Sequence, residues 1–396
     1  MRSAGLTKIE AVDIFYLRGP EVLDISDNSQ DATLIRISAG GHVGWGECDA
    51  SPLPSISALV GPMSHVACRP VKDSVLGETL DDPSDIARIN QRIKARSLDL
   101  LQAGHVLAGV DTALWDLLGK RLNEPVWKLL GQKRAMPKRA YGSQLFGDTP
   151  QETLEKARRQ RANGFVAVKF GWGPFGHGDV ATDADHLAAA REGLGEDGVL
   201  LVDAGTVWID DLEAATARLS ALRATRATWL EEPFVSGALQ SYKALSERSG
   251  PVGIAGGEGA HDFYLARAMI DYGGLDFVQI DAGRMGISDA RRVAKYASSK
   301  DVRFVNHTFN SDLALSASLQ PFAENTKDDI CEYPVERKLV GDSLVRDRIA
   351  RDADGMVRAP DEQGLGVEPD VNVIRRFLVD VEVKVAGDVI YKTPEL

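Results

Sequence analysis

Residues 199–233 read VLLVDAGTVWIDDLEAATARLSALRATRATWLEEP, and this stretch carries the pattern that decides the fold. Two short apolar runs, VLLV and TWL, end at Asp203 and Glu231. Between them, residues 211–226 have apolar and polar side chains at helical spacing. A strand, a helix and a second strand within this length indicate a parallel β-α-β unit, because parallel strands need a crossover connection.

The same unit repeats from about Arg139 onward. The eight apolar runs are Ala140–Leu145, Val166–Phe170, Val199–Val202, Thr228–Leu230, Val252–Ala255, Phe277–Ile280, Val302–Val305 and Asp329–Cys331. Seven of them stop at a polar or charged residue, and these residues are Lys169, Asp203, Glu231, Glu258, Asp281, His307 and Glu332. The steps between these residues are 34, 28, 27, 23, 26 and 25 positions. Eight such units predict an α/β fold of the (β/α)₈ TIM-barrel type. A doubly wound open sheet has a similar alternation, but nothing here resembles the glycine-rich phosphate turn of its usual versions.

Residues 1–130 follow a different pattern. Leu34–Ser38 and Val43–Glu47 are strand-like runs on either side of a Gly-Gly pair, which predicts a hairpin. Leu98–Leu118 has apolar residues at helical spacing and no proline, so we expect a helix there. A few antiparallel strands followed by helices are typical of an α+β unit.

The C-terminal part of the chain departs from the barrel rhythm. Asp352–Gly355 is expected to be a turn between two short strands, and Val381–Tyr391 could pair with the N-terminal strands. The predicted division is therefore residues 1–130 as an α+β domain, residues 131–355 as the barrel, and residues 356–396 as a segment that returns to the first domain.

Composition excludes several classes of protein. The 396 residues carry 46 Lys and Arg against 58 Asp and Glu, and the net charge of −12 disfavours nucleic-acid or anionic-membrane partners. Hydrophobic residues make up 44%, which is typical of a globular chain. Three cysteines form no pairing pattern, no apolar run approaches a membrane span, and charged residues stand where a signal peptide needs an apolar stretch. We therefore expect a cytoplasmic protein.

Three of the strand-ending acids point to a metal ion. Asp203, Glu231 and Glu258 follow consecutive strands, so they converge on one side of the barrel mouth, where barrel active sites lie. Carboxylate oxygens are the ligands that Mg²⁺ prefers, whereas zinc would favour His or Cys. The alternative is that each is a surface or salt-bridged acid.

The other strand-ending residues could move protons. Lys169 follows an apolar run, and burial beside a cation would lower its pKa enough for a general base; the alternative is a lysine paired with a cluster carboxylate. Asp281 and His307 lie on adjacent strands, where a carboxylate fixes the imidazole tautomer; the alternative is an ordinary buried histidine. Glu332 could donate to a developing oxyanion if it were protonated.

In order, Lys169 and the motifs VDAG, WLEEP, GGE, QIDAG, NHTF and CEYP resemble the enolase superfamily, mandelate racemase subgroup. The resemblance covers nearly the whole chain, and residues 105–131 look like the segment that leads from capping domain to barrel. It implies an α+β capping domain on a modified TIM barrel and, usually, a homo-oligomer. It also implies Mg²⁺ at Asp203, Glu231 and Glu258, acid/base roles for Lys169 and the Asp281–His307 pair, and Glu332 beside the enolate oxygen.

Two departures from the family pattern matter. Ala167 stands where the family commonly has a first lysine, and Gly205 stands where asparagine is frequent. The choice of Glu231 over Glu232 as metal ligand rests on the resemblance alone. Specificity is expected from residues 16–28 and 47–57, and the candidate substrate contacts are Arg284, Arg18, Tyr16, Trp172 and His261.

The favoured activity is Mg²⁺-dependent dehydration of an aldonate-type sugar acid to a 2-keto-3-deoxy acid. Racemisation or epimerisation at the α-carbon needs the same two bases and is the main alternative. Cycloisomerases are less expected, because they usually carry a lysine where this chain has Asp281. A Schiff-base aldolase using Lys169 and a non-catalytic acid-binding barrel remain further alternatives.

Overall fold

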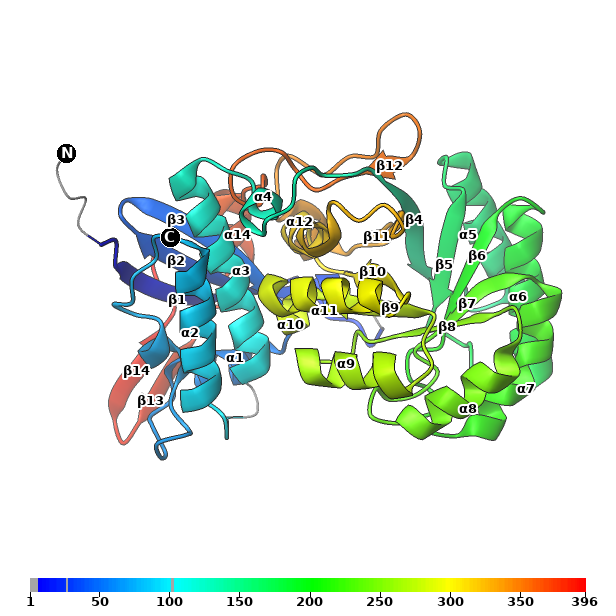
Figure 1. The fold of residues 1–396 in the computed structure, drawn as a ribbon, viewed down its shortest axis with the longest axis horizontal. Coiled ribbons are helices and arrows are strands. Elements are labelled where there is room, and N and C mark those ends of the chain that lie inside the picture. Colours follow the sequence, from blue (N-terminus) through cyan, green and yellow to red (C-terminus); the bar gives the residue numbers. More distant parts are fainter. Residues whose placement is uncertain (1–5, 26–27, 101–102) are drawn as a thin grey trace.

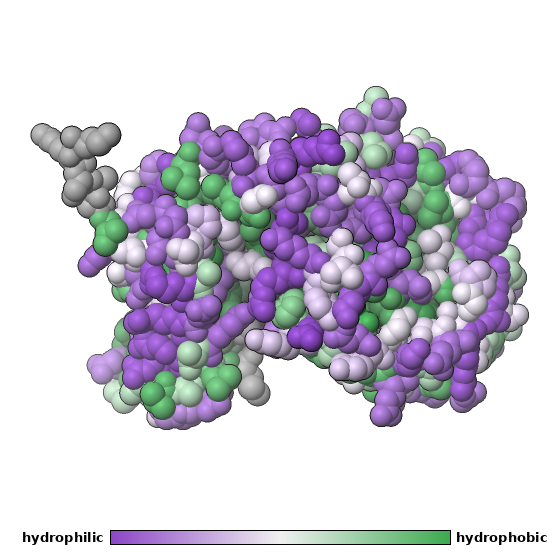
Figure 2. Space-filling view, in the orientation of Figure 1, coloured by the Kyte–Doolittle hydropathy of each residue, from purple (hydrophilic) through white to green (hydrophobic). Residues whose placement is uncertain are grey.

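The computed structural model describes residues 6–25, 28–100 and 103–396. Figure 1 shows a barrel beside a smaller unit built mainly from the N-terminal part of the chain. Figure 2 shows these as two lobes, with hydrophilic residues spread over both on the face in view. None of the helices within the described residues is both long and apolar enough to cross a membrane.

The smaller unit is an antiparallel sheet with helices packed on it. Its strands are β1 (Ile9–Arg18), β2 (Asp31–Ala39) and β3 (His42–Cys48), in that spatial order, with the short 3₁₀ helix η1 (Asn28–Gln30) before β2. Its helical elements are α1 (Pro52–Val60), the 3₁₀ helix η2 (Val71–Ser74), α2 (Pro83–Arg96), α3 (Ala103–Leu122) and α4 (Val126–Leu129). The predicted hairpin is confirmed, since β2 and β3 pair up to Ala39 opposite His42.

The helix predicted over Leu98–Leu118 is α3, displaced toward the C-terminus. It begins at Ala103, and residues 101–102 lie outside the described residues. It continues through Gly119 to Leu122, so this glycine does not end the helix. Gly119 instead allows the C-terminal loop to pack closely against the helix. A Cβ at Gly119 would lie 2.6 Å from the Cα of Gly364, so only glycine lets the C-terminal loop pack here.

Eight parallel strands form the predicted barrel, and the fold class is confirmed. They are β4 (Lys138–Leu145), β5 (Ala167–Gly171), β6 (Val199–Asp203), β7 (Ala227–Glu231), β8 (Gly253–Gly256), β9 (Phe277–Asp281), β10 (Arg303–His307) and β11 (Ile330–Pro334). The helices between and after them are α5 (Pro150–Ala162), α6 (Val180–Leu194), α7 (Leu212–Ala224), α8 (Leu239–Ser249), α9 (Phe263–Tyr272), α10 (Ala282–Met285), α11 (Ile287–Ser299), α12 (Asp312–Leu319) with the 3₁₀ helix η3 (Gln320–Phe322), and α13 (Leu339–Ser343).

The barrel is nearly closed. Its strands follow the order β10-β9-β8-β7-β6-β5-β4-β11, and the two-residue strand β12 (Met356–Val357) pairs antiparallel with β4. Side-chain bonds join β10 to β11, because Asn306 Oδ1 accepts from the Glu332 backbone N–H at 2.9 Å. Asn306 Nδ2 also donates to the Glu332 carbonyl at 3.4 Å.

A layer of apolar side chains fills the barrel beneath its mouth. The layer consists of Tyr141, Ala167, Leu201, Trp229, Ala255 and Val305, all of them buried. Side chains two residues apart on a strand point to the same side, so Lys169, Asp203, Glu231 and His307 stand directly above four of these residues. The packed layer therefore supports the side chains at the mouth.

The C-terminal segment contacts the N-terminal sheet but does not extend it. Beyond α14 (Val371–Phe377), β13 (Glu382–Val385) and β14 (Asp388–Lys392) pair with each other in a separate two-stranded sheet. The predicted pairing of Val381–Tyr391 with the N-terminal strands is therefore wrong. The tight turn at Ala386 and Gly387, both with positive φ, folds the segment back on itself.

Single contacts tie this segment to β1 instead. Tyr391 donates its hydroxyl to the Ile14 carbonyl at 2.8 Å, and the Val379 N–H donates to the Tyr16 carbonyl at 2.8 Å. The turn at Asp352–Gly355 has only one strand beside it, β12. The domain boundaries at 130/131 and 355/356 stay a prediction.

Candidate active site

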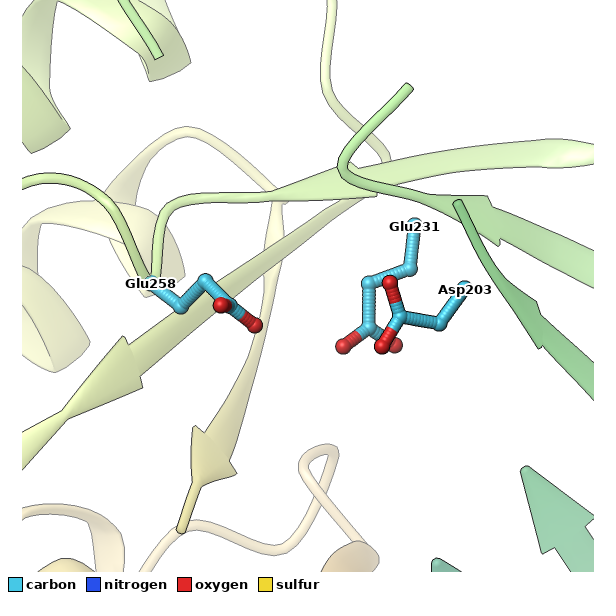
Figure 3. Close-up of side chains that lie close together, drawn as sticks. All are labelled: Asp203, Glu231 and Glu258. Carbon is cyan, nitrogen blue, oxygen red and sulfur yellow. The ribbon is translucent and has the colours of Figure 1, made fainter. Parts of the chain in front are cut away.

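Three carboxylates meet at the barrel mouth. Asp203 ends β6, Glu231 ends β7, and Glu258 follows β8; each offers an oxygen within 4.8 Å of the others. Figure 3 shows Asp203 and Glu231 side by side, with the Glu258 carboxylate directed toward them. The structure thus brings together the three residues predicted as metal ligands.

Glu232 makes hydrogen bonds of its own and is not one of the three clustered acids. The Glu232 carboxylate accepts hydrogen bonds from the Gly257 N–H at 2.5 Å and the Tyr242 hydroxyl at 2.9 Å. Burial raises its pKa to about 7, helped by the charge of Glu258. Glu231 is the residue that faces the cluster, and the Trp229 indole donates to its Oε2 at 3.0 Å.

Lys169 lies against the cluster from β5. Its Nζ contacts Glu231 Oε1 and lies 2.8 Å from Glu332 Oε1 and 3.5 Å from Asp203 Oδ2. Burial lowers the pKa of Lys169, but the charges of Glu231 and Glu332 outweigh burial and hold it well above the usual value. The expected lowering required a cation beside Lys169 and stays a prediction. In the present arrangement carboxylates surround the ammonium, and these contacts are those of the alternative, a lysine paired with the cluster.

His307 lies against the cluster from β10, on the other side of the barrel. Its Nδ1 is 2.7 Å from Asp281 Oδ2, which is the predicted pair, and its Nε2 is 3.0 Å from Glu258 Oε2. Burial lowers the His307 pKa, yet the charges of Glu258 and Glu332 and the bond with Asp281 raise it to about 10. Asp281 is itself positioned by the Gly283 N–H, which donates to its Oδ1 at 2.6 Å.

Arg284 joins the cluster to the smaller unit. Its Nε donates to Asp49 Oδ2 at 2.5 Å, and its Nη1 lies 3.2 Å from Glu258 Oε1. The Asp49 N–H donates to the Gly283 carbonyl at 3.0 Å, which fixes β3 against the barrel at this point. Arg284, one of the predicted substrate contacts, therefore places a cation next to Glu258.

Opposing charges separate the pKa values of the acids. Burial raises the pKa of Glu258, but His307, Arg284 and Lys169 outweigh it and lower the pKa to about 2. Burial raises the pKa of Asp203 to about 6, although the Lys169 charge opposes the shift. Carboxylates this close repel one another, so the site favours a cation among them.

Glu332 faces two donors. Its Oε2 accepts from the Thr308 N–H at 2.7 Å, and its Oε1 faces the Lys169 ammonium. In both contacts the Glu332 carboxylate accepts a hydrogen bond. Its suggested role as a protonated acid that donates to a developing oxyanion stays a prediction.

A cavity of about 140 Å³ opens above these groups. Its lining includes Lys169, Asp203, Glu258, Arg284, His307, Trp172, Ser143 and Phe309. Trp172, a predicted substrate contact, is 42% exposed at the rim. Gly205 has a φ of +56°, and a Cβ there would lie 2.6 Å from the Trp172 ring, which explains glycine at this position.

The remaining predicted contacts lie farther out. Arg18 is exposed at the end of β1, opposite Asp31, and Tyr16 packs partly buried in the same strand. Neither lines the cavity at the cluster. His261 is exposed after β8 and lines a neighbouring cavity instead.

Sequence reasoning missed three residues of the site. Ser143 lines the cavity from β4, and strand alternation from the buried Tyr141 would have identified it. Asp49 and His105 come from the smaller unit, and no local pattern marks them.

Two family models match this chain. One, described as "Enolase C-terminal domain-like", matches residues 152–373, more than half of the chain. The other, described as "Mandelate racemase / muconate lactonizing enzyme, N-terminal domain", matches residues 17–131. The chain belongs to the enolase superfamily, in its mandelate racemase subgroup. The nearly closed barrel and the N-terminal capping domain are the fold of that superfamily.

Individual relatives agree with this membership. A solved structure described as a predicted mandelate racemase from Rhodobacter sphaeroides is 56% identical, with a TM-score of 0.94, and covers 98% of this chain and 100% of that chain. D-galactarolactone cycloisomerase of Agrobacterium fabrum is 30% identical over 355 residues, 85% of this chain and 88% of the relative. D-galactonate dehydratase of Variovorax paradoxus is 30% identical over 352 residues, 83% of this chain and 86% of the relative. The chain is thus similar to enolase-superfamily enzymes of more than one activity.

Proposed function

We propose that this enolase-superfamily enzyme dehydrates an aldonate-type sugar acid to a 2-keto-3-deoxy acid with the help of Mg²⁺. The observation that carries the proposal is the placement of Lys169 and His307 on β5 and β10, on opposite sides of the barrel. Both contact the same acidic cluster, so an acid bound there would have one proton-transfer group on each side.

The residues present fit a divalent cation. Asp203, Glu231 and Glu258 supply oxygen donors close enough to share one ion, and no His or Cys belongs to this group of described residues. Lys169, Arg284 and His307 now neutralise the same carboxylates. A bound Mg²⁺ would supply Lewis-acid stabilisation of the dianion that forms when the proton α to a carboxylate is removed.

The protein's own groups would complete the reaction. Lys169 or His307, whichever faces the α-hydrogen, takes that proton, and the C–H electron pair moves into the carboxylate group to give the enediolate dianion. That pair then forms the C2–C3 double bond as the C3–OH bond breaks. The other group protonates the departing hydroxyl, which leaves as water. The resulting enol then tautomerises to the keto acid. Asp281 holds the His307 tautomer through Nδ1, which keeps Nε2 toward the cluster.

With a divalent cation at Glu231, more of Lys169 would be in the neutral form that can accept a proton. The high pKa of Lys169 comes from unneutralised Glu231 and Glu332, against the effect of burial. Neutralising Glu231 removes the first of these charges, and burial then acts in the direction that the sequence predicted.

Two alternative activities use the same groups. Racemisation or epimerisation needs proton removal on one side of the α-carbon and return on the other. Cycloisomerisation is favoured by one observation, the similarity to D-galactarolactone cycloisomerase over 85% of this chain. That similarity weakens the expectation against cycloisomerases that was based on Asp281.

The test is a panel of sugar acids and sugar lactones with Mg²⁺, assayed for keto acids with semicarbazide and for isomers by NMR in D₂O. We expect a keto acid from at least one aldonate, and loss of its formation in Lys169→Ala and His307→Asn. An acid returned with deuterium at the α-carbon and no keto acid would show a racemase. An isomerised lactone would show a cycloisomerase, and no reaction with any acid would contradict the proposal.

Homo-oligomerisation and a cytoplasmic location stay predictions. So does the expectation that the protein binds a small carboxylate substrate and neither nucleic acid nor membranes. A size measurement of the purified protein by light scattering would test the first.

A further inference from the structure

A second cavity, of about 370 Å³, lies beside the one at the cluster. It opens between the capping domain and the barrel, and its lining includes Asp31, Asp49 and His105 from the capping domain and His261, Arg284 and Asn310 from the barrel. None of the three capping-domain residues has a role in the chemistry proposed above.

Arg284 separates this second cavity from the cluster. It lines both cavities, and its guanidinium bridges Asp49 on one side and Glu258 on the other. Because the guanidinium of Arg284 belongs to the lining of both cavities, a six-carbon acid whose carboxylate is at the cluster is placed to extend past Arg284 toward the second cavity.

The second cavity offers neutral hydrogen-bonding groups. His105 Nε2 lies 3.2 Å from His261 Nδ1 with the rings edge to face. Among the described residues, the other nitrogen of each ring has no hydrogen-bond partner and is available to a ligand. Partial burial lowers the pKa of both imidazoles. The charge of His261 adds to the effect at His105, and the charge of Arg284 adds to it at His261, so the neutral form of each ring is favoured. Asn310 is 6% exposed, and within the described residues its Oδ1 has no hydrogen-bond partner.

The charges in the second cavity disfavour an anion. Asp31 and Asp49 are both carboxylates, and burial and the charge of Asp49 raise the pKa of Asp31, although the charge of Arg18, outside the lining, opposes the shift. Arg284 is the only Lys or Arg among the described lining residues, and it is shared between Asp49 and Glu258. A carboxylate entering here would meet two acids and a cation that already has partners.

We propose that this second cavity binds the uncharged, hydroxyl-bearing end of the sugar acid and rejects a second carboxylate. The enzyme is therefore selective for monocarboxylic sugar acids over dicarboxylic ones of the same configuration. This inference rests on the proposed function and specifies its substrate class.

The first experiment compares matched substrates on the Mg²⁺-loaded enzyme. The panel pairs each six-carbon aldonate with the aldarate of the same configuration, and keto acid formation is measured for both. We expect kcat/KM to favour the aldonate by at least about 100-fold, because placing like charges together costs several kcal/mol. An aldarate that reacts as well as its aldonate would overturn this inference while leaving the dehydratase proposal standing. If no acid yields a keto acid, the dehydratase proposal itself fails, and the inference with it.

The second experiment removes one imidazole and varies substrate length. His261→Ala should raise KM for the six-carbon aldonate about tenfold with little change in kcat, the effect of one lost hydrogen bond. The Ki of a four-carbon aldonate, measured as a competitive inhibitor, should change less than about twofold, because it is too short to reach the imidazole. Exposed His42, in the β2–β3 hairpin, provides the control variant His42→Ala, which should change neither constant. Equal changes in both constants with His261→Ala would overturn the inference.

Discussion

Glu47 offers a quantitative test of the interface between the capping domain and the barrel. It is the second-to-last residue of β3 and is buried, and the Ser311 hydroxyl donates to its Oε2 at 2.5 Å. Burial raises its pKa from the ordinary 4.5 to about 7, although the bond from Ser311 and the charge of Arg337 oppose the shift. A difference of this size between folded and unfolded protein corresponds to about 3 kcal/mol.

The sign of the pH dependence follows from the raised pKa. Below pH 4.5, Glu47 is protonated in both states and makes no pH-dependent contribution. As the pH rises from 4.5 to 7, the unfolded chain loses this proton first, so the folded state becomes relatively less stable. Above pH 7 the full penalty of about 3 kcal/mol is present. Glu47→Gln, which keeps the shape of the neutral acid, removes this dependence.

The assay is thermal or urea unfolding of the Glu47→Gln and unsubstituted proteins between pH 4.5 and 8.5, with EDTA present so that metal binding does not contribute. The stability of the variant relative to the unsubstituted protein should rise by about 3 kcal/mol across this range. Glu155→Gln, at an exposed position on α5, should show a constant difference. A constant difference for Glu47→Gln as well would refute the reasoning about its burial.

Two further predictions concern the packing beside the acidic cluster and a buried ion pair of the capping domain. Gly171→Ala should weaken Mg²⁺ binding at least about tenfold by calorimetry, because its Cβ would lie 2.7 Å from Asp203 Oδ2. Gly237→Ala, where a Cβ meets nothing within 4 Å, should bind as before; equal losses would contradict the steric argument. Asp116→Asn should destabilise the protein by about 2–4 kcal/mol in thermal unfolding, since it breaks a buried ion pair with Lys120 and turns an amide toward backbone N–H groups. A melting temperature within a degree of the original would contradict that reason.

The barrel and the cluster could be predicted from sequence because both follow from local patterns. Short runs at regular spacing define parallel strands, and parallel strands bring their carboxyl ends to one mouth. The positions of Asp203, Glu231 and His307 at strand ends therefore follow from counting along the chain, whereas the choice of Glu231 over Glu232 as metal ligand does not. Lys169 was placed correctly, but the direction of its pKa depends on contacts with Glu231 and Glu332 that no spacing reveals.

Contacts between distant segments could not be predicted. Asp49 meets Arg284 across 235 positions, and His105 meets His261 across 156, because the capping domain docks on the barrel mouth. His105 has no signal in its own segment, where α3 looks like an ordinary helix. The segment that contains β13 and β14 could pair with itself through the two-residue turn or with the N-terminal strands. Packing in the folded protein decides between the two, and the local sequence does not show it.

The central claim is that the acidic cluster holds Mg²⁺ and that the groups around it remove a proton α to a carboxylate. The most direct measurement is NMR in D₂O of the α-hydrogen of an accepted sugar acid, with the original protein and with Glu258→Gln. The α-hydrogen should disappear with Mg²⁺ present, and it should persist with EDTA or when Glu258 is replaced. Loss of that hydrogen at an undiminished rate in EDTA, or in Glu258→Gln, would contradict the account.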